Sequence, residues 1–183
     1  MADVRPEVAL PTSWKNQPLP TRVATLPFRH GYTAEEFAAL TRGLIPEEME
    51  DKWFVFMQDG VLNFHRSWTG VCIYRVVLHE ENGVYIVHEV LVNRDPEQYK
   101  STDDAYDSAL LNFLIDALLL CKRTPFPVPG DVPTEAPAGL YQHHMVGRGC
   151  GLNVDIDAKM TEYIRARPKD FVFEGEIERV IRK

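Results

Sequence analysis

The stretch DKWFVFMQDGVLNFHRSWTG, residues 51–70, predicts a β-hairpin and decides the fold. Asp59-Gly60 is typical of a type I′ turn, because that turn needs positive φ at both central residues. Aromatic and β-branched residues, which favour strands, flank the turn on both sides. A two-residue turn sets the register of the hairpin, so Gln58 should face Val61 and Trp53 should face Arg66.

Side chains alternate along a strand, so this register divides the hairpin into two faces. We expect one face to join the core, with the residues Trp53, Val55, Met57, Leu62 and Phe64. The opposite face mixes rings with polar groups and carries Phe54, Phe56, Asn63, His65 and Ser67. A mixed face of this kind is typical of a ligand-binding surface or of a solvated second layer.

The sequence after the hairpin predicts two more strands and one long helix. Residues 71–79 and 84–93 are strongly β, and Asn82-Gly83 between them offers a second I′-type turn. A helix should run from Ser101 to about Lys122, since hydroxyls and carboxylates cap its start and most of its circumference is apolar. The predicted fold class is therefore α+β: an antiparallel β-meander of about four strands packed on one long buried helix, with short peripheral helices.

The remaining segments should surround this body within a single domain that covers residues 1–183. Thr33 and Glu36 form a capping box that predicts a short helix to about Arg42. Residues 158–165 predict another short helix, and residues 171–181 alternate well enough for a last strand.

Two proline-rich segments complete the predicted organisation of the chain. Residues 1–30 read as an extended arm that wraps the body, with Trp14 and Phe28 as anchors. Residues 124–139 read as an extended connection, because prolines are incompatible with a helix interior.

The composition of the chain narrows the classes of function. The 183 residues are 45% hydrophobic and 26% charged, as in ordinary globular proteins. The net charge of −7 argues against sequence-independent binding of nucleic acid over a large surface. No leader-like segment opens the chain, and its most apolar run, residues 109–121, is shorter than the ~20 residues that a membrane span needs. We therefore expect a cytoplasmic protein without a membrane partner.

The three cysteines, Cys72, Cys121 and Cys150, are scattered and show no C-x-x-C spacing. An odd number of widely spaced cysteines fits reduced thiols better than a disulfide framework or a zinc cage.

Residues 65–70 form the first candidate site, because they gather chemically useful side chains next to a flexible glycine. His65 is the candidate acid–base catalyst, and Ser67 is the second candidate catalytic residue. Arg66 would bind an anion, while Trp68 and Thr69 would contact the rest of a ligand. Along a strand, however, His65 and Ser67 would be ~7 Å apart, too far for a direct proton relay. The structural alternative is a tight connection in which Trp68 packs and Arg66 pairs with a glutamate.

Residues 142–151 form the second candidate site, in which glycines alternate with an arginine. Gln142, His143, Gly147 and Arg148 are its candidate ligand-binding residues, since such a segment can form a nest of backbone N–H groups for phosphate. The spacing of a P-loop is absent. The alternative is a loop with one solvated arginine. We expect the two segments to share a pocket with Arg66 and Arg148 on its walls.

Histidines and the last cysteine raise two weaker interpretations. A metal site would draw on His65, His79, His88, His143 and His144. In the register of the Asn82-Gly83 turn Val77 faces His88, which makes His79 a diagonal neighbour of His88. No H-x-x-x-H or H-x-H spacing supports metal ligation, so no metal is predicted. Cys150 beside His143 or His144 is an alternative nucleophile.

The segments DKWF and HRSWTG, residues 51–54 and 65–70, resemble the signature of an uncharacterised family of small bacterial domains. The stretch from Gln142-His143 to Gly147-Arg148 is similar to a further part of that signature. The resemblance implies an association with modules that process ADP-ribose, such as macro domains. It names no activity, substrate or cofactor.

Two functions therefore compete. The first is a protein that binds, and in one version hydrolyses, a phosphorylated small molecule of nucleotide or ADP-ribose type. The second is a non-enzymatic interaction module, such as a toxin-neutralising or regulatory partner, with Trp68 as its anchor. The fold alone does not choose between them, and whether the chain is an enzyme stays open.

Overall fold

The computed structural model describes residues 8–48 and 51–127 of the 183-residue chain. The predicted helix at 158–165, the predicted strand at 171–181, most of the proline-rich connection and the whole second candidate site lie outside the described residues.

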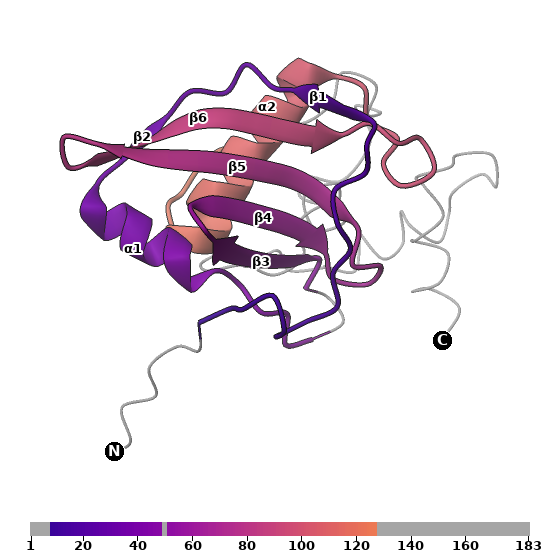
Figure 1. Cartoon of the computed structure of the whole chain (residues 1–183), viewed down its shortest axis with the longest axis horizontal. Coiled ribbons are helices and arrows are strands. Elements are labelled where there is room, and N and C mark those ends of the chain that lie inside the picture. Colours follow the sequence, from indigo (N-terminus) through magenta and orange to yellow (C-terminus); the bar gives the residue numbers. More distant parts are fainter. Residues whose placement is uncertain (1–7, 49–50, 128–183) are drawn as a thin grey trace, which may run out of the picture.

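The described residues form one antiparallel sheet of six strands (Figure 1). The strands are β1 (Val23–Thr25), β2 (Gly31–Tyr32), β3 (Trp53–Gln58), β4 (Val61–Arg66), β5 (Cys72–Glu81) and β6 (Val84–Asn93). Their order is β1-β6-β5-β4-β3, and β2 also pairs with β6. The predicted four-strand meander is thus confirmed as β3 to β6. The N-terminal arm adds the two short strands to the edge of β6.

The first hairpin has the predicted register. Gln58 pairs with Val61 and Trp53 pairs with Arg66. The turn residues Asp59 and Gly60 have φ angles of 51° and 75°, as a type I′ turn requires. The turn chemistry therefore placed each side chain on its correct face.

The second hairpin departs from the predicted register through a β-bulge. Pairing from the Asn82-Gly83 turn is regular as far as Leu78 opposite Val87, but the next pair is Val77 with Glu89. The predicted pairing of Val77 with His88 is therefore wrong by one residue. His88 is the extra residue, and its ring stacks on that of His79 with centroids 4.9 Å apart.

The single long helix of the prediction is wrong. The described residues hold two short α-helices, α1 (Ala34–Arg42) and α2 (Asp104–Leu114), and a π-helical turn, η1 (Ile115–Leu119), that follows α2 directly. The i→i+5 bond from the Leu120 N–H to the Ile115 carbonyl changes the helix type. Cys121 then ends the helical path with a φ of 53°. The capping box of Thr33 and Glu36, which starts α1, is confirmed.

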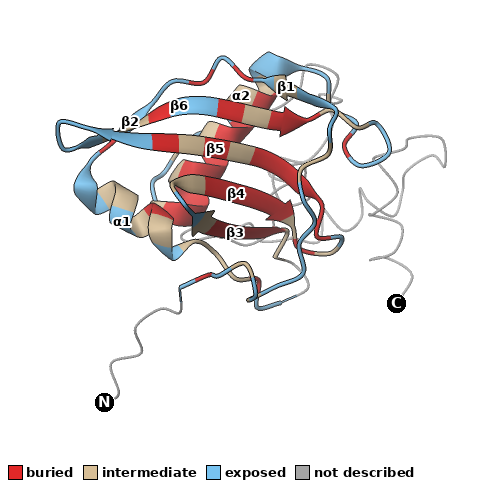
Figure 2. Cartoon of the chain, in the orientation of Figure 1, coloured by how far each residue is buried: buried red, intermediate tan, exposed pale blue. Residues whose placement is uncertain are grey.

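The main core lies between the sheet and α2, which runs behind the strands in Figure 1. It contains Trp53, Phe64 and Tyr74 from the sheet and Leu111 and Phe113 from α2. Figure 2 shows buried residues along β3 and β4 and more exposed ones along β5 and β6. None of the helices in the described part of the chain is long and apolar enough to cross a bilayer.

The N-terminal arm crosses the ends of β5, β4 and β3 on the face away from α2 (Figure 1). Both predicted anchors make contacts there or in the core. The Trp14 indole N–H donates to the Ser67 carbonyl at 2.7 Å, and Phe28 is buried in the main core.

The cysteine prediction is corrected at one position. Cys72 is a buried free thiol, as expected, whereas Cys121 is disulfide-bonded. Sequence spacing could not reveal this bond, because it depends on which distant segments of the chain meet.

Candidate functional site

The open end of the first hairpin is held by a dense set of backbone bonds. The Ser67 N–H donates to the Lys52 carbonyl at 3.1 Å, and the Ser67 hydroxyl donates to the Asp51 carbonyl at 2.6 Å. The Gly70 N–H donates to the Arg66 carbonyl at 2.8 Å, closing a tight turn in which Gly70 has a φ of 77°. The backbone of residues 66–70, the hairpin-end loop, is thereby fixed against β3.

Two cations lie on two indole rings at this hairpin end. The guanidinium carbon of Arg66 is 4.3 Å from the ring centroid of Trp53, and the ammonium of Lys52 is 4.2 Å from that of Trp68. Arg66, Lys52 and Trp68 are half-buried, whereas Trp53 is fully buried. Two positive charges therefore lie beside aromatic surface in a chain whose net charge is −7.

A buried polar network lies on the same side of the sheet. The Asp107 carboxylate accepts hydrogen bonds from the hydroxyls of Tyr99 at 2.5 Å, Tyr74 at 3.0 Å and Ser101 at 3.1 Å. It also pairs with the Arg94 guanidinium at 2.7 Å. Since Asp107 is fully buried, four donors compensate for the loss of its hydration.

Arg66 and this network are neighbours. The Arg66 guanidinium lies over the Trp53 ring, and the Trp53 ring stacks on the Tyr74 ring with centroids 6.1 Å apart. Burial and the Asp107 charge raise the pKa of Tyr99, and the positive charge of Arg66 acts in the opposite direction. Arg66 thus lies on the Trp53 ring, which in turn stacks on Tyr74 of the network.

His65 lies on the opposite face of the sheet from Arg66. It is 3% exposed, and its Nε2–H donates to the carbonyl of Gln17 at 3.2 Å. Its ring stacks on that of Phe56, with centroids 5.3 Å apart. Burial lowers the pKa of His65 to about 4, although the bond to Gln17 opposes that shift. His65 is therefore a neutral imidazole at physiological pH.

Two other predicted residues of this segment, Ser67 and Thr69, bond to other parts of the chain and not to His65. Ser67 is buried, with its hydroxyl bonded to the Asp51 carbonyl and not to His65. Thr69 is exposed, and its carbonyl accepts from the Gln17 side chain at 3.0 Å. The structure therefore places Arg66 on the Trp53 ring and Lys52 on the Trp68 ring, while His65 faces the N-terminal arm.

Gln142, His143, Gly147 and Arg148 lie outside the described residues, so their predicted proximity to Arg66 stays a prediction. Among the residues that the structure does describe, no group of three or more His, Cys, Asp or Glu side chains could hold a metal ion.

Sequence reasoning missed Lys52 as a site residue and the whole network around Asp107. Two features of the sequence could have revealed these residues. Lys52 directly precedes Trp53, so the hairpin register already placed it beside Ser67. Asp107 is a carboxylate on an otherwise apolar face of a helix, and such a residue usually has buried partners.

Comparison of the chain with family models, with curated proteins and with solved structures finds no match. The resemblance of the hairpin and its loop to a bacterial family linked to ADP-ribose processing therefore stays a prediction.

Proposed function

We propose that the chain binds a phosphorylated small molecule of nucleotide or ADP-ribose type at the open end of the β3–β4 hairpin. The observation that carries this proposal is the pair of cation–indole contacts, Arg66 on Trp53 and Lys52 on Trp68, at one hairpin end. In this proposal Arg66 and Lys52 hold phosphate, and Trp68 packs against a ring of the ligand.

The geometry of Arg66 suits an oxyanion. A guanidinium that stacks on an indole uses its flat face for that contact, and its N–H donors lie in the plane of the group. Paired N–H donors match the oxygens of a phosphate. The buried Trp53 beneath Arg66 restricts the motion of the guanidinium, which lowers the entropy lost on binding.

Lys52 and Trp68 supply the complementary contacts. An ammonium interacts with phosphate as a point charge. The half-buried indole of Trp68 offers apolar surface to a base or sugar. Both residues are fixed to the hairpin by backbone bonds around Ser67 and Lys52. The acidic remainder of the chain makes this local positive charge selective for small anions over long nucleic acids.

The proposal is for binding and not for hydrolysis. Ser67 is bonded to a backbone carbonyl, and His65 lies on the other face of the sheet beneath the N-terminal arm. The polar atoms that bond in both side chains bond to backbone carbonyls, so the structure gives no support to a catalytic role for either.

Titration calorimetry with ADP-ribose, ADP and NAD tests the proposal. At least one of them should bind, and Arg66→Ala should weaken that binding about 10- to 150-fold, the value of a charge-assisted hydrogen bond. Arg75→Ala is the matched control, because Arg75 is a half-buried arginine of β5 that does not lie at the hairpin end. Absence of binding by all three ligands, or equal losses in the two variants, would refute the proposal.

A second candidate is the interaction module, and one observation favours it. Val8, Leu10 and Trp14 are large apolar residues of the arm that stay 49%, 53% and 38% exposed. Exposed apolar residues close together are typical of protein contacts. If none of the nucleotides binds and Trp14→Ala abolishes capture of a single stoichiometric protein partner, the interaction module is the better description.

The cytoplasmic location also stays a prediction. A disulfide at Cys121 is more usual in an oxidising compartment, and it argues against that location. Cell fractionation with a thiol-trapping reagent separates the two possibilities.

A further inference from the structure

Residues 14–17 of the arm, named here the strap, close over the hairpin-end loop through four hydrogen bonds. The Trp14 indole N–H donates to the Ser67 carbonyl at 2.7 Å. The Gln17 N–H donates to the Gly70 carbonyl at 2.8 Å, and its side-chain amide donates to the Thr69 carbonyl at 3.0 Å. The fourth bond runs from His65 Nε2 to the Gln17 carbonyl at 3.2 Å.

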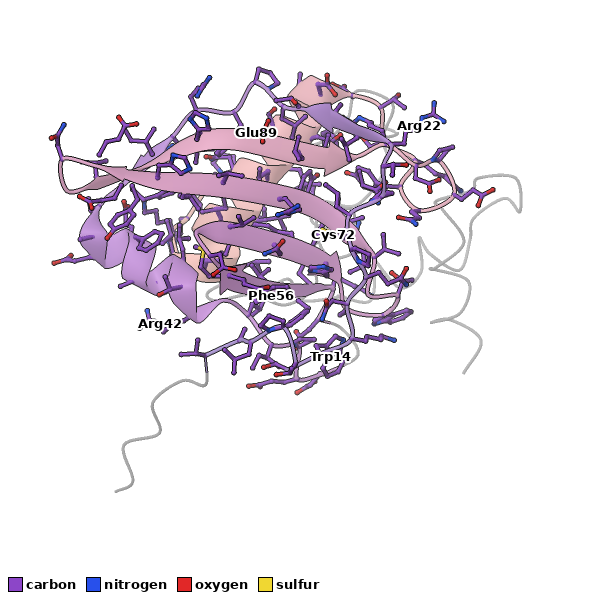
Figure 3. All side chains as sticks on the ribbon, in the orientation of Figure 1. Trp14, Arg22, Arg42, Phe56, Cys72 and Glu89 are labelled. Atoms are coloured by element: carbon purple, nitrogen blue, oxygen red, sulfur yellow. The ribbon has the colours of Figure 1, made fainter. Side chains whose placement is uncertain are left out.

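The strap bonds to an imidazole whose neighbour on the next strand is a buried thiol. His65 and Cys72 are Cα partners in the β4–β5 ladder, so their side chains share one face of the sheet. His65 is 3% exposed and Cys72 is 1% exposed. Figure 3 labels Cys72 near one end of the sheet. Cys72 is not a member of either hydrophobic cluster of the core.

The imidazole has one unused polar atom. Because the Gln17 carbonyl can only accept, Nε2 carries the proton, and Nδ1 is left as an acceptor. Nδ1 is buried and has no hydrogen-bond partner. A buried acceptor without a partner is costly, and opening of the strap would let water bond to Nδ1.

The strap itself contributes little to the core. Residues 14–17 are all exposed, and outside the arm the strap bonds only to His65 and to the backbone of the hairpin-end loop. The Asn16 side chain bonds within the arm, to the carbonyls of Pro11 and Trp14. Its flanks are held independently. The Ala9 N–H bonds to the Arg42 carbonyl at 2.8 Å, and β1 is paired with β6. Segments with few apolar contacts between fixed ends are those that open locally.

From this arrangement we infer that the strap opens as a unit while the sheet stays intact, and that opening uncovers His65 and Cys72 together as a thiol–imidazole site for small electrophiles. In the closed form the thiol is unreactive, since burial raises the pKa of Cys72 to about 12. In the open form water reaches both groups. The Cys72 sulfur then adds to one carbon of the maleimide C=C bond and forms an S–C bond. The π bond and the S–H bond break, and the thiol proton ends on the other carbon.

The experiment measures N-ethylmaleimide labelling of Cys72 in the full chain without any nucleotide. The readout is the mass of tryptic peptide 67–75, in which Cys72 is the sole cysteine. Trp14→Phe removes the indole donor and keeps an aromatic ring, and Gln17→Ala removes the amide donor. Each should speed labelling about 2- to 12-fold, the effect of one hydrogen bond on the opening equilibrium.

Arg29→Ala is the matched control, because Arg29 bonds the His88 carbonyl from another part of the same N-terminal segment. It should leave the labelling rate unchanged. Low concentrations of urea separate local from global opening. A rate that is insensitive to urea supports the strap, whereas a rate that rises with the full m-value of unfolding overturns it. The inference is independent of the proposed ligand, so either can fail without the other.

Discussion

Gln17 and His65 are 48 positions apart, yet the carbonyl of one accepts a hydrogen bond from the imidazole of the other at 3.2 Å. The bond fixes the tautomer of His65 and joins the arm to β4. It lies on the face of the sheet opposite to Arg66. The most chemically suggestive segment of the chain is thus divided between two faces, one cationic and half-buried and the other closed by the arm.

The first prediction concerns acid pH. The pKa of His65 is about 4 in the folded protein and 6.5 for an ordinary histidine. Between these two values the unfolded state binds more protons than the folded state, so stability rises with pH through this window. His65→Gln, which keeps a donor for the Gln17 carbonyl but does not titrate, should flatten that rise.

Urea denaturation of both proteins at pH 7, 5.5 and 4.5 measures the effect. Carboxylates also titrate below pH 5, but they are common to both proteins and cancel in the difference. The stability of the wild type relative to the variant should fall as pH drops from 7 to 4.5. A pH-independent difference would contradict the pKa shift.

The successes and failures of the sequence analysis have physical causes. Asp59-Gly60 specifies its turn locally, so the register of the first hairpin followed from two residues. Thr33 and Glu36 likewise specify the start of α1 from within one turn. The bulge at His88 and the π-turn at Ile115 depend on packing between distant segments, which no local pattern encodes.

The candidate site was predicted in part for the same reason. Alternation along β4 already separated His65 from Arg66, because adjacent residues of a strand face opposite ways. The hairpin register placed Lys52 opposite Ser67, but it did not place Lys52 on the Trp68 ring. The Gln17 bond to His65 could not be predicted either, since a proline-rich arm has no periodicity from which to place it.

The second prediction concerns the buried carboxylate of Asp107. Asp107→Asn should destabilise the fold by about 3–5 kcal/mol, since it leaves the largely buried Arg94 without its buried partner. Asp104→Asn is the control, because Asp104 pairs with the same guanidinium but its side chain is 52% exposed. That change should cost about 0–1 kcal/mol. Guanidinium denaturation measures both, and equal losses would show that burial does not govern this network.

The third prediction concerns Gly43, which ends α1. Its φ of 65° and ψ of −155° belong to a region open essentially to glycine alone, and an added Cβ would lie 2.2 Å from the Val55 carbonyl oxygen. Gly43→Ala should cost about 2–5 kcal/mol, combining ~1–2 for the backbone with ~1–3 for the overlap. Gly83→Ala, with a φ of 81° and no atom within 4 Å of its Cβ, should cost about 1–2 kcal/mol. Thermal unfolding of the pair should therefore separate steric overlap from backbone strain.

The fourth prediction divides the proposed ligand site between its charge and its ring. Arg66 should act on phosphate, so Arg66→Ala should weaken both ADP and inorganic pyrophosphate. Trp68 should act on the base, so Trp68→Leu should weaken ADP by about 1–3 kcal/mol, the value of one base–aromatic contact, and leave pyrophosphate unchanged. Trp68→Leu also removes the ring beneath Lys52, and loss of pyrophosphate binding in that variant would show that the indole serves only to hold the ammonium. Calorimetry with the two ligands on both variants distinguishes these roles.

Raising NaCl from 50 to 500 mM should weaken the binding of pyrophosphate more than the binding of ADP, because screening acts on charge and not on stacking.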